Sequence, residues 1–186
     1  MRAKSVVVAV NAWIGQLLPA LADVIVPARE QMLAYHPLPP VLTTGVTVDM
    51  VNGEYMQQTL DGTLLIGGCS SVASNWDLGV WEMAPTTVVQ EAIEQVVPRL
   101  FPALAPLQVV QRWAGLLGCT TDMQPIVDYA PDLPNVLFVG GFTGHGMPFG
   151  MRFGQVLAAS VTNGSLPEGL KPFRLGRPTL KKWSRL

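Results

Sequence analysis

The stretch Asn135–Asn163 reads NVLFVGGFTGHGMPFGMRFGQVLAASVTN, and the rest of the chain is organised around it. Its residues 136–139 are large or β-branched apolar residues, a pattern typical of a strand buried on both faces. Glycines interrupt this run, and small residues then recur every four positions from Gly150 to Ala158, as on one face of a packed helix. The stretch therefore predicts a strand, a glycine-rich turn and a helix, in that order.

This order of elements is compatible with two roles. Backbone without Cβ atoms lets a ligand approach closely, and the free N–H groups at a helix start attract an anionic or electron-rich group. Glycine-rich turns also occur only to let a helix pack tightly on a sheet, because no single glycine spacing is specific. The neighbouring Thr143, His145 and Met147 favour the first role, a binding site at the helix start.

The middle of the chain predicts an antiparallel sheet. Strands are expected at 46–51, 54–59 and 63–68, with hairpin signals at Asn52-Gly53 and Asp61-Gly62. Further extended segments are expected at 5–10, 24–35, 108–114 and 126–127.

Two helical segments are also expected. After the first strand, a short turn of helix is disturbed by Pro19. A longer helix begins at Pro85 and covers one face of the sheet, with Thr87 and Gln90 at capping-box spacing and Pro98 as its end. Its apolar stripe consists of Val89, Ile93, Val96 and Val97.

Composition narrows the functional class. The chain has 186 residues, a net charge of −1 and 13% charged residues, which gives no sign of a nucleic-acid partner. No apolar run is long enough for a transmembrane segment. The two cysteines make no disulfide framework and no signal-peptide pattern is found, so a cytoplasmic protein is expected. No metal site is expected either, because His36, His145, Cys69 and Cys119 lack ligand-like spacing.

A family resemblance extends over nearly the whole chain. Four segments carry it: GGFTGHGMPFGMRFGQVLA at 140–158, VVVAVNAW at 6–13, GTLLIGG at 62–68 and RWAGLLGCTTDMQPIV at 112–127. In order and spacing they resemble the C-terminal half of the D-amino-acid oxidase, glycine oxidase and sarcosine oxidase family of FAD-dependent amine oxidoreductases. The four segments are specific as a set.

The resemblance implies a mixed α+β or α/β architecture in four parts. Residues 1–28 would be a late strand and helix of a Rossmann-like FAD-binding domain, and 29–115 a substrate-binding antiparallel domain with a covering helix, entered through PAREQM at 27–32. Residues 116–170 would return to the FAD domain, and 171–186 would be a surface tail. The N-terminal GxGxxG unit that binds the FAD pyrophosphate is missing, so we expect a second polypeptide to carry that half.

The resemblance also implies the contacts with FAD. The helix start would direct its dipole and N–H groups at the pyrimidine edge of the flavin, where negative charge collects on reduction. The implied cofactor-binding residues are Asn11, Ala12, Gly141, Gly144, His145, Gly146 and Met147. No catalytic side chain is assigned, because the cofactor supplies the chemistry. Asp122 and Pro125, in a DxxP pattern, are expected to fix a loop.

Family positions that bear charge are altered in this sequence. Leu117 replaces the arginine that grips the substrate carboxylate in glycine oxidase-like members, and Pro148 replaces a lysine of monomeric sarcosine oxidases. A carboxylate needs a cation or several donors to leave water. The remaining candidates for substrate binding are Arg29, Tyr55 and Gln57.

The sequence thus predicts the C-terminal part of an FAD-dependent oxidoreductase that oxidises the C–N bond of an amino acid or secondary amine. Leu65 stands where monomeric sarcosine oxidases place an oxygen-activating lysine, which favours a dehydrogenase over an oxidase. The alternative is a non-catalytic fragment or partner-binding subunit that needs another chain to complete the flavin site. The substrate and the electron acceptor stay open.

Overall fold

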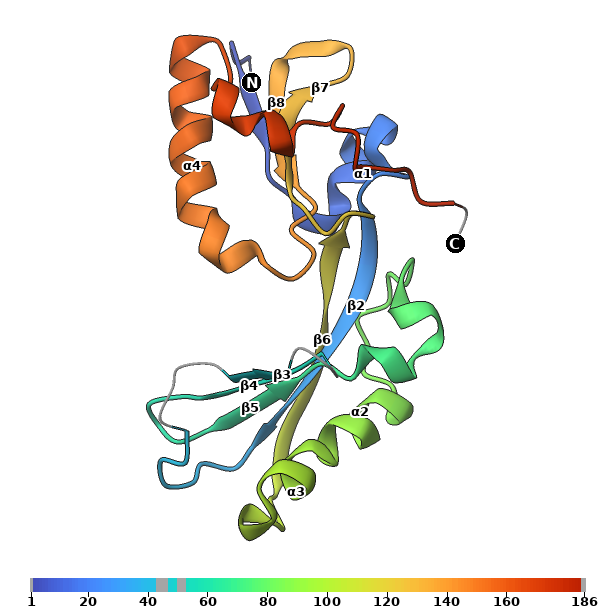
Figure 1. Cartoon of the computed structure of the whole chain (residues 1–186), viewed down its shortest axis with the longest axis vertical. Coiled ribbons are helices and arrows are strands. Elements are labelled where there is room, and N and C mark those ends of the chain that lie inside the picture. Colours follow the sequence, from blue (N-terminus) through green and yellow to red (C-terminus); the bar gives the residue numbers. More distant parts are fainter. Residues whose placement is uncertain (1, 43–46, 50–52, 185–186) are drawn as a thin grey trace. The chain divides into compact units, whose positions relative to one another are not determined.

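The computed structural model describes residues 2–42, 47–49 and 53–184. The chain forms two compact units (Figure 1): unit 1 is Met1–Ala28 with Leu117–Leu186, and unit 2 is Arg29–Leu116. The division falls inside two long strands, β2 and β6, which are described with unit 2. Each unit has its own hydrophobic core.

Unit 1 is built on a three-stranded sheet with the strand order β1-β8-β7. The central strand β8 (Leu133–Gly140) lies parallel to β1 (Val6–Val8) and antiparallel to β7 (Ile126–Ala130). In register, Val7 is opposite Leu137. The apolar run at 136–139 therefore forms the middle of the sheet, as predicted.

Both faces of this sheet are covered. On one face, Leu137 packs with Phe153 and other apolar residues of α4 (Gly146–Asn163). On the other face, Phe138 is fully buried in a cluster that includes Ile14 of α1 (Ile14–Leu17). The predicted order of strand, glycine-rich turn and helix is confirmed, and alternate side chains of β8 enter the two cores because successive strand residues point to opposite faces.

The segment between β1 and β2 is helical only in short pieces. Two 3₁₀ turns, Asn11–Trp13 and Pro19–Leu21, flank the four-residue α1. The α-helix ends at Leu17, two residues before Pro19, which confirms the predicted disturbance. Leu21 is fully buried whereas Leu17 is exposed, so only part of the predicted apolar spacing is used for packing.

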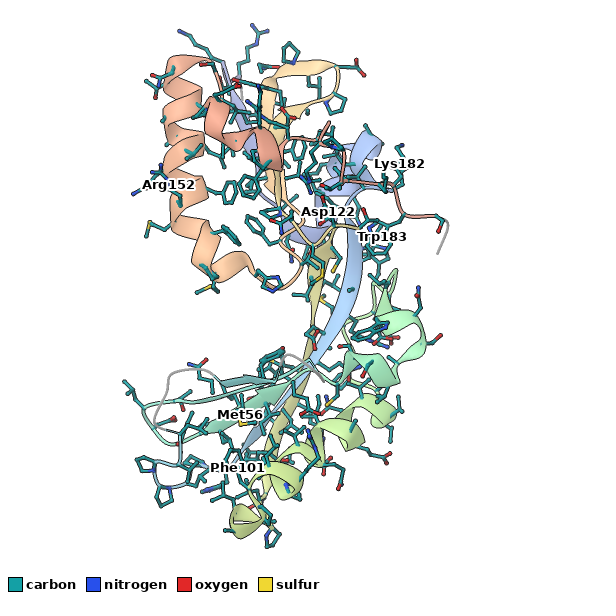
Figure 2. The ribbon with its side chains drawn as sticks, in the orientation of Figure 1. Met56, Phe101, Asp122, Arg152, Lys182 and Trp183 are labelled. Atoms are coloured by element: carbon teal, nitrogen blue, oxygen red, sulfur yellow. The ribbon has the colours of Figure 1, made fainter. Side chains whose placement is uncertain are left out.

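The C-terminal segment of unit 1 lies mostly at the surface. Its described part, up to Ser184, is held in place there by side-chain contacts. Arg174 pairs with Asp128, and the indole N–H of Trp183 donates to the carbonyl of Cys119 at 3.2 Å. Figure 2 shows Lys182 and Trp183 on this last stretch of chain.

Unit 2 is built on an antiparallel sheet with the order β3-β4-β5-β2-β6. Its strands are β2 (Val26–Tyr35), β3 (Thr47–Asp49), β4 (Glu54–Gln58), β5 (Leu64–Gly67) and β6 (Val109–Cys119). β3, β4 and β5 form the predicted meander, although Asn52 of the first hairpin signal lies outside the described residues. Gly62 in the second turn has φ +91°, the left-handed backbone that favours glycine.

Helices α2 (Thr87–Glu94) and α3 (Val96–Leu100) cover one face of the unit 2 sheet. The predicted apolar stripe of this helical segment is buried against strand residues such as Met56, and Phe101 packs at the edge of the same core (Figure 2). The covering helix that the sequence predicts is thereby confirmed.

Both predicted helix boundaries in unit 2 are wrong. Thr86, not Thr87, is the N-cap, and its hydroxyl accepts a hydrogen bond from Gln31 instead of capping the helix. The side chain of Gln90 turns to Gln31 and the carbonyl of Met32, so no capping box forms. Pro98 lies within α3, near its start, where the missing N–H of proline is tolerated.

Among the described residues, no helix combines the length and the apolar character that crossing a membrane requires.

Candidate functional site

Unit 1 contains a cavity of about 340 Å³ at the end of its sheet. This volume lies near the lower end of the roughly 300–1,000 Å³ range of ligand pockets, enough for one ring system and not for a dinucleotide. The cavity is lined by Ala9, Asn11, Leu117, Gly118, Val139, Gly140, Phe142, Thr143, Gly144, Gly146 and Met147. The wall thus combines backbone-rich glycines with a few apolar side chains.

The glycine-rich turn is held by its own threonines and by left-handed backbone. Gly141 and Gly144 have φ +70° and +85°, and Thr143 has φ +50°. The N–H of Thr143 donates to the carbonyl of Gly118 at 3.0 Å, and its hydroxyl accepts from the N–H of Thr120 at 3.2 Å. The turn is therefore fixed by the protein before any ligand binds.

The glycines of the turn differ in what a side chain would meet. A Cβ at Gly141 would lie 2.4 Å from the Cγ2 of Thr120, so the protein itself requires glycine there. A Cβ at Gly146 would find only Phe142, at an ordinary contact distance of 3.5 Å. The protein leaves room at Gly146, and a ligand in the cavity would occupy that room.

The start of α4 presents two adjacent N–H groups that lack a partner within the helix. The first N–H groups of a helix have no intrahelical acceptor. Here the N–H of His145 donates to the carbonyl of Phe142 at 2.9 Å, and Pro148 has no N–H. The N–H groups of Gly146 and Met147 remain, and no side chain caps them in the described structure. Both residues line the cavity, so its wall offers a pair of donors to an electron-rich ligand.

Asn11 also lines the cavity. Its backbone has φ +51°, which asparagine tolerates better than most residues. Its side-chain oxygen accepts the N–H of Gly118 at 3.1 Å, which ties the turn after β1 to the end of β6. Ala12 is buried close to this contact. A Cβ atom built on Gly118 would lie 3.3 Å from the backbone nitrogen of Ala12.

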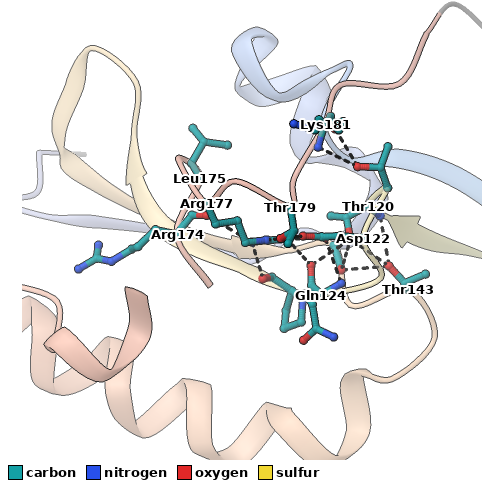
Figure 3. A network of polar contacts seen from close by, with 12 residues as sticks. Thr120, Asp122, Gln124, Thr143, Arg174, Leu175, Arg177, Thr179 and Lys181 are labelled. Carbon is teal, nitrogen blue, oxygen red and sulfur yellow. Dashed lines mark hydrogen bonds and ion pairs between the residues drawn. The ribbon is translucent and has the colours of Figure 1, made fainter. Parts of the chain in front are cut away.

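A network of polar contacts supports the loop between β6 and β7 (Figure 3). Asp122 accepts two hydrogen bonds from the guanidinium of Arg177, at 2.6 and 2.7 Å, and one from the hydroxyl of Thr179. Arg177 also donates to the carbonyls of Gln124 and Pro125. The Arg177 hydrogen bonds hold the pKa of Asp122 well below its usual range. Asp122 therefore fixes a loop, as predicted, and remains an anion.

In unit 2, Arg29 has a structural partner in place of the substrate carboxylate that the sequence predicts for it. Its guanidinium donates to Asp77 at 2.8 Å and to the carbonyl of Ala84 at 3.0 Å, and both charged side chains are buried. Gln31, two residues further on, donates to the hydroxyl of Thr86. These two residues of the PAREQM segment therefore hold the loop that leads into α2.

The face of the unit 2 sheet opposite α2 carries the other two candidates for substrate binding. Tyr55 and Gln57 are alternate residues of β4, and in register they are opposite Gly67 and Leu65 of β5. Burial, with the negative charge of Glu30 as a smaller cause, raises the pKa of the Tyr55 phenol, which stays neutral.

Glu30 was missed by the sequence interpretation. Its carboxylate accepts the hydroxyl of Ser70 at 3.1 Å, and burial raises the pKa of this carboxyl above its ordinary value. The available signal was its position between Arg29 and Gln31, because strand alternation directs a charged residue there to the face opposite the core.

Known proteins that resemble this chain identify its family. The sequence profile described as FAD dependent oxidoreductase (DAO) matches residues 1–160. The chain belongs to this FAD-dependent oxidoreductase family. FAD is the cofactor of the family, and the relatives include glycine oxidases and sarcosine oxidases.

Curated members of the DAO family match over most of this chain. A probable oxidoreductase, OrdL, of Rhizobium meliloti is 27% identical over 156 residues, covering 81% of this chain and 34% of its own length. The glycine oxidase of Pseudomonas aeruginosa is 30% identical over 133 residues, covering 70% of this chain and 34% of its own length. The chain thus spans about a third of the length of these relatives.

Solved structures share the DAO fold. The L-proline dehydrogenase of P. horikoshii superposes with a TM-score of 0.77 at 22% identity, over 91% of this chain and 46% of the other. The glycine oxidase of Geobacillus kaustophilus gives a TM-score of 0.78 at 22% identity, over 95% and 46%. The mixed α/β sheets described above are therefore those of FAD-dependent oxidases and dehydrogenases.

The cavity in unit 1 has features that suit one edge of the flavin ring system of FAD, the cofactor of the family. Its two free N–H groups suit adjacent acceptor atoms, and the room at Gly146 suits a flat ring close to the backbone. Of the predicted cofactor-binding residues, Asn11, Gly144, Gly146 and Met147 line the cavity. The other three predicted residues do not line the cavity. Gly141 directly follows β8, His145 is the N-cap of α4, and Ala12 is next to Asn11 in the chain.

Proposed function

We propose that this chain forms the flavin-edge and substrate-binding parts of an enzyme that oxidises the C–N bond of an amino acid or a secondary amine. FAD, when bound, supplies the acceptor for the hydride removed from the carbon next to nitrogen. The observation that carries the proposal is the pair of uncapped N–H groups of Gly146 and Met147, two residues that line a cavity in a chain of the DAO family.

Each part of the turn has a role in this proposal. The N–H groups of Gly146 and Met147 would donate to the electron-rich edge of the flavin, and the positive end of the α4 dipole would favour negative charge there. Gly144 and Asn11 shape the wall, while Gly141, His145 and Ala12 keep the turn in place. The protein therefore binds and orients, and no side chain of the turn is required to act as a nucleophile.

Unit 2 is proposed as the substrate-binding part, with Tyr55 and Gln57 facing the substrate. Arg29 contributes by holding the loop through Asp77, because its charge is already matched. Leu65 is register partner of Gln57, half-buried, and adds no charge to this face. Residues 29–116 contain no lysine at all. A cation close to the flavin would stabilise superoxide, so the apolar Leu65 supports a dehydrogenase over an oxidase.

A direct test is reduction of the flavin without oxygen. The chain is assembled with a polypeptide that carries a GxGxxG dinucleotide-binding unit, loaded with FAD and mixed anaerobically with a panel of amino acids and secondary amines. At least one panel member is expected to bleach the visible absorption of the flavin. The proposal is overturned if dithionite bleaches the bound flavin while every amine and amino acid leaves it unchanged.

A second candidate function is a partner-dependent or non-catalytic subunit. The observation in its favour is apolar surface without cover in unit 1. Val6 and Val7 of the edge strand β1 are about two-fifths exposed, and Met147 and Met151 of α4 are almost fully exposed. Such surface is typical of a protein interface.

A titration with FAD separates the two candidates. These 186 residues supply donors for the flavin edge but no GxGxxG unit for the pyrophosphate. Since each factor of ten in affinity corresponds to about 1.4 kcal/mol, loss of an anion site worth several kcal/mol weakens binding by orders of magnitude. We expect tight binding only when the GxGxxG polypeptide is added. If the assembly binds FAD and is never reduced by amines, the non-catalytic candidate is favoured.

A further inference from the structure

Unit 2 has an unusual balance of charge. Between residues 29 and 116 it contains three arginines and no lysine. The acidic residues in the same range are Glu30, Asp49, Glu54, Asp61, Asp77, Glu82, Glu91 and Glu94. A negative potential therefore surrounds the part of the chain proposed to bind substrate.

Every arginine of unit 2 is already paired with an acid. Arg29 pairs with Asp77, Arg99 with Glu54 and Arg112 with Glu94. A substrate carboxylate entering this unit would meet no free arginine, and a carboxylate that leaves water needs a cation or several hydrogen-bond donors. Recognition of an acid by this unit is therefore disfavoured.

Glu30 differs from these paired acids, because it is a partly buried carboxyl group with no cation beside it. Within the described ranges, no arginine, lysine or histidine nitrogen lies within 4 Å of its carboxylate. Its hydrogen-bond partners are neutral: the hydroxyl of Ser70 and the backbone of Gln31 and Gly68. The negative charge of Asp77 acts on it as well, and raises its pKa further. Partly buried carboxylates are normally paired, so this one lacks the partner that its position calls for.

The surroundings of Glu30 also suit a cation. The ring of Tyr55 lies over Gly67, next along the sheet, and is close enough to Glu30 for the two groups to influence each other electrostatically. An aromatic face and a carboxylate both attract an ammonium group. A purely structural role, accepting hydrogen bonds from Ser70 and the backbone around Gly68, needs no negative charge and would be served equally by glutamine.

We propose that Glu30, with the ring of Tyr55, binds a positively charged group of the substrate, so that the substrate is a cationic amine and not an amino acid held by its carboxylate. This assignment rests on the proposed function and deepens it, because it selects between the two substrate classes left open above. Glu30 is thus a specificity-determining residue.

The first test measures binding without any redox step. The full chain, labelled with ¹⁵N, is titrated with n-propylammonium chloride and separately with sodium propionate, and the amide signals of Gln31, Gly68 and Ser70 are followed. We expect saturable shifts with n-propylammonium and none with propionate. Glu30→Gln is expected to weaken the binding of n-propylammonium at least tenfold, while the exposed control Glu91→Gln leaves it unchanged.

Three results would overturn the proposal: saturable binding of propionate at the same amides, binding of n-propylammonium that is unaffected by Glu30→Gln, or no binding of n-propylammonium to the FAD-loaded assembly. Failure of the proposed function looks different. In that case n-propylammonium binds through Glu30 and no amine bleaches the flavin. If instead amino acids bleach the flavin equally well in the parent and in Glu30→Gln, the reaction stands and the assignment of Glu30 falls.

Discussion

The ring of Tyr55 in β4 occupies the space that a side chain at Gly67 in β5 would fill. A Cβ built on Gly67 comes within 2.5 Å of the Cζ and Oη atoms of Tyr55. The two residues are register partners in an antiparallel pair, the arrangement that brings side chains of neighbouring strands closest. The missing side chain at Gly67 therefore determines where the phenol of Tyr55 lies.

Gly67→Ala is expected to move the Tyr55 ring without unfolding unit 2. The colliding atoms are at the far end of a flexible side chain, which can turn away. Gly68→Ala is the contrasting variant, because Gly68 has φ +105° and its Cβ would meet the carbonyl oxygen of Gly53 at 2.2 Å. We expect it to lose about 1–3 kcal/mol of unfolding free energy. Thermal unfolding and the ring signals of Tyr55 measure both effects, and equal destabilisation by the two variants would contradict this account.

Gly146→Val is expected to abolish flavin retention in the complete assembly while circular dichroism stays nearly unchanged. The protein leaves room for the side chain, so the collision would be with the ligand alone. Gly169→Val, in the same unit and with no atom within 4 Å of its Cβ, is the matched control and should retain flavin. Equal flavin absorption after gel filtration of parent and Gly146→Val would show that backbone at Gly146 does not meet the flavin.

Leu65→Lys is expected to speed reoxidation of the reduced flavin by air. The parent should react slowly with oxygen and quickly with an artificial quinone, because an apolar residue stands at this position. Leu65→Met is the control, since it changes the shape of the side chain and adds no charge. The lysine acts only if it stays protonated, so the oxygen rate should fall at a pH above the lysine pKa, which burial lowers. Rapid hydrogen peroxide production by the parent would make oxidase the correct class.

Glu30→Gln is expected to raise the unfolding free energy at neutral pH. Burial raises the pKa of this carboxyl above its ordinary value of 4.5, so the folded state binds the proton more tightly than the unfolded state. The contribution of Glu30 to stability is therefore complete below pH 4.5 and is lost as the pH rises through the folded pKa. Urea unfolding at several pH values measures the unfolding free energy of parent and variant. The difference between the two should be constant in acid and should grow in favour of the variant as the pH rises. A difference that changes only in acid would contradict a raised pKa for Glu30.

Asp122→Asn should have the opposite dependence on pH. The hydrogen bonds from Arg177 lower the pKa of Asp122, so its contribution is present above the ordinary pKa of 3.8 and is lost as the pH falls through the folded value. At neutral pH the variant leaves the buried Arg177 without its anion, at a cost of about 3 kcal/mol. Glu168→Gln, which removes the exposed pair with Lys171, should cost less than about 1 kcal/mol. Urea unfolding at pH 7 compares the two, and similar losses would contradict a buried role for Asp122.

Local sequence patterns were enough to predict the elements of this fold. Predictions were wrong where a side chain binds a partner that lies far away in the sequence. The run at 136–139 and the Asp61-Gly62 turn depend on neighbouring residues alone, so the sequence was enough. The cap of α2 was wrong because Gln31, 55 residues away, takes the hydroxyl of Thr86. Arg29 was predicted to bind substrate because its actual partner, Asp77, is 48 residues further along the chain.

The candidate flavin site shows the same division. Its turn was predictable because the glycines and the helix start are consecutive in sequence. The role of Asp122 was predicted, but its partner Arg177, 55 residues later, could not be. Glu30 was overlooked because nothing in a sequence shows that a carboxylate lacks a cation once the chain is folded.

During synthesis, β1 leaves the ribosome well before β8, the strand with which it pairs in parallel. Val6 is opposite Val136, so the partner of β1 leaves the ribosome 130 residues after β1 itself. At roughly 5–20 residues per second this delay is about 7–26 seconds. The strand pairs of unit 2 are all shorter in sequence range and can form during that interval. The apolar β1 thus stays without its partner strand throughout this delay, and a chaperone would protect it during that period.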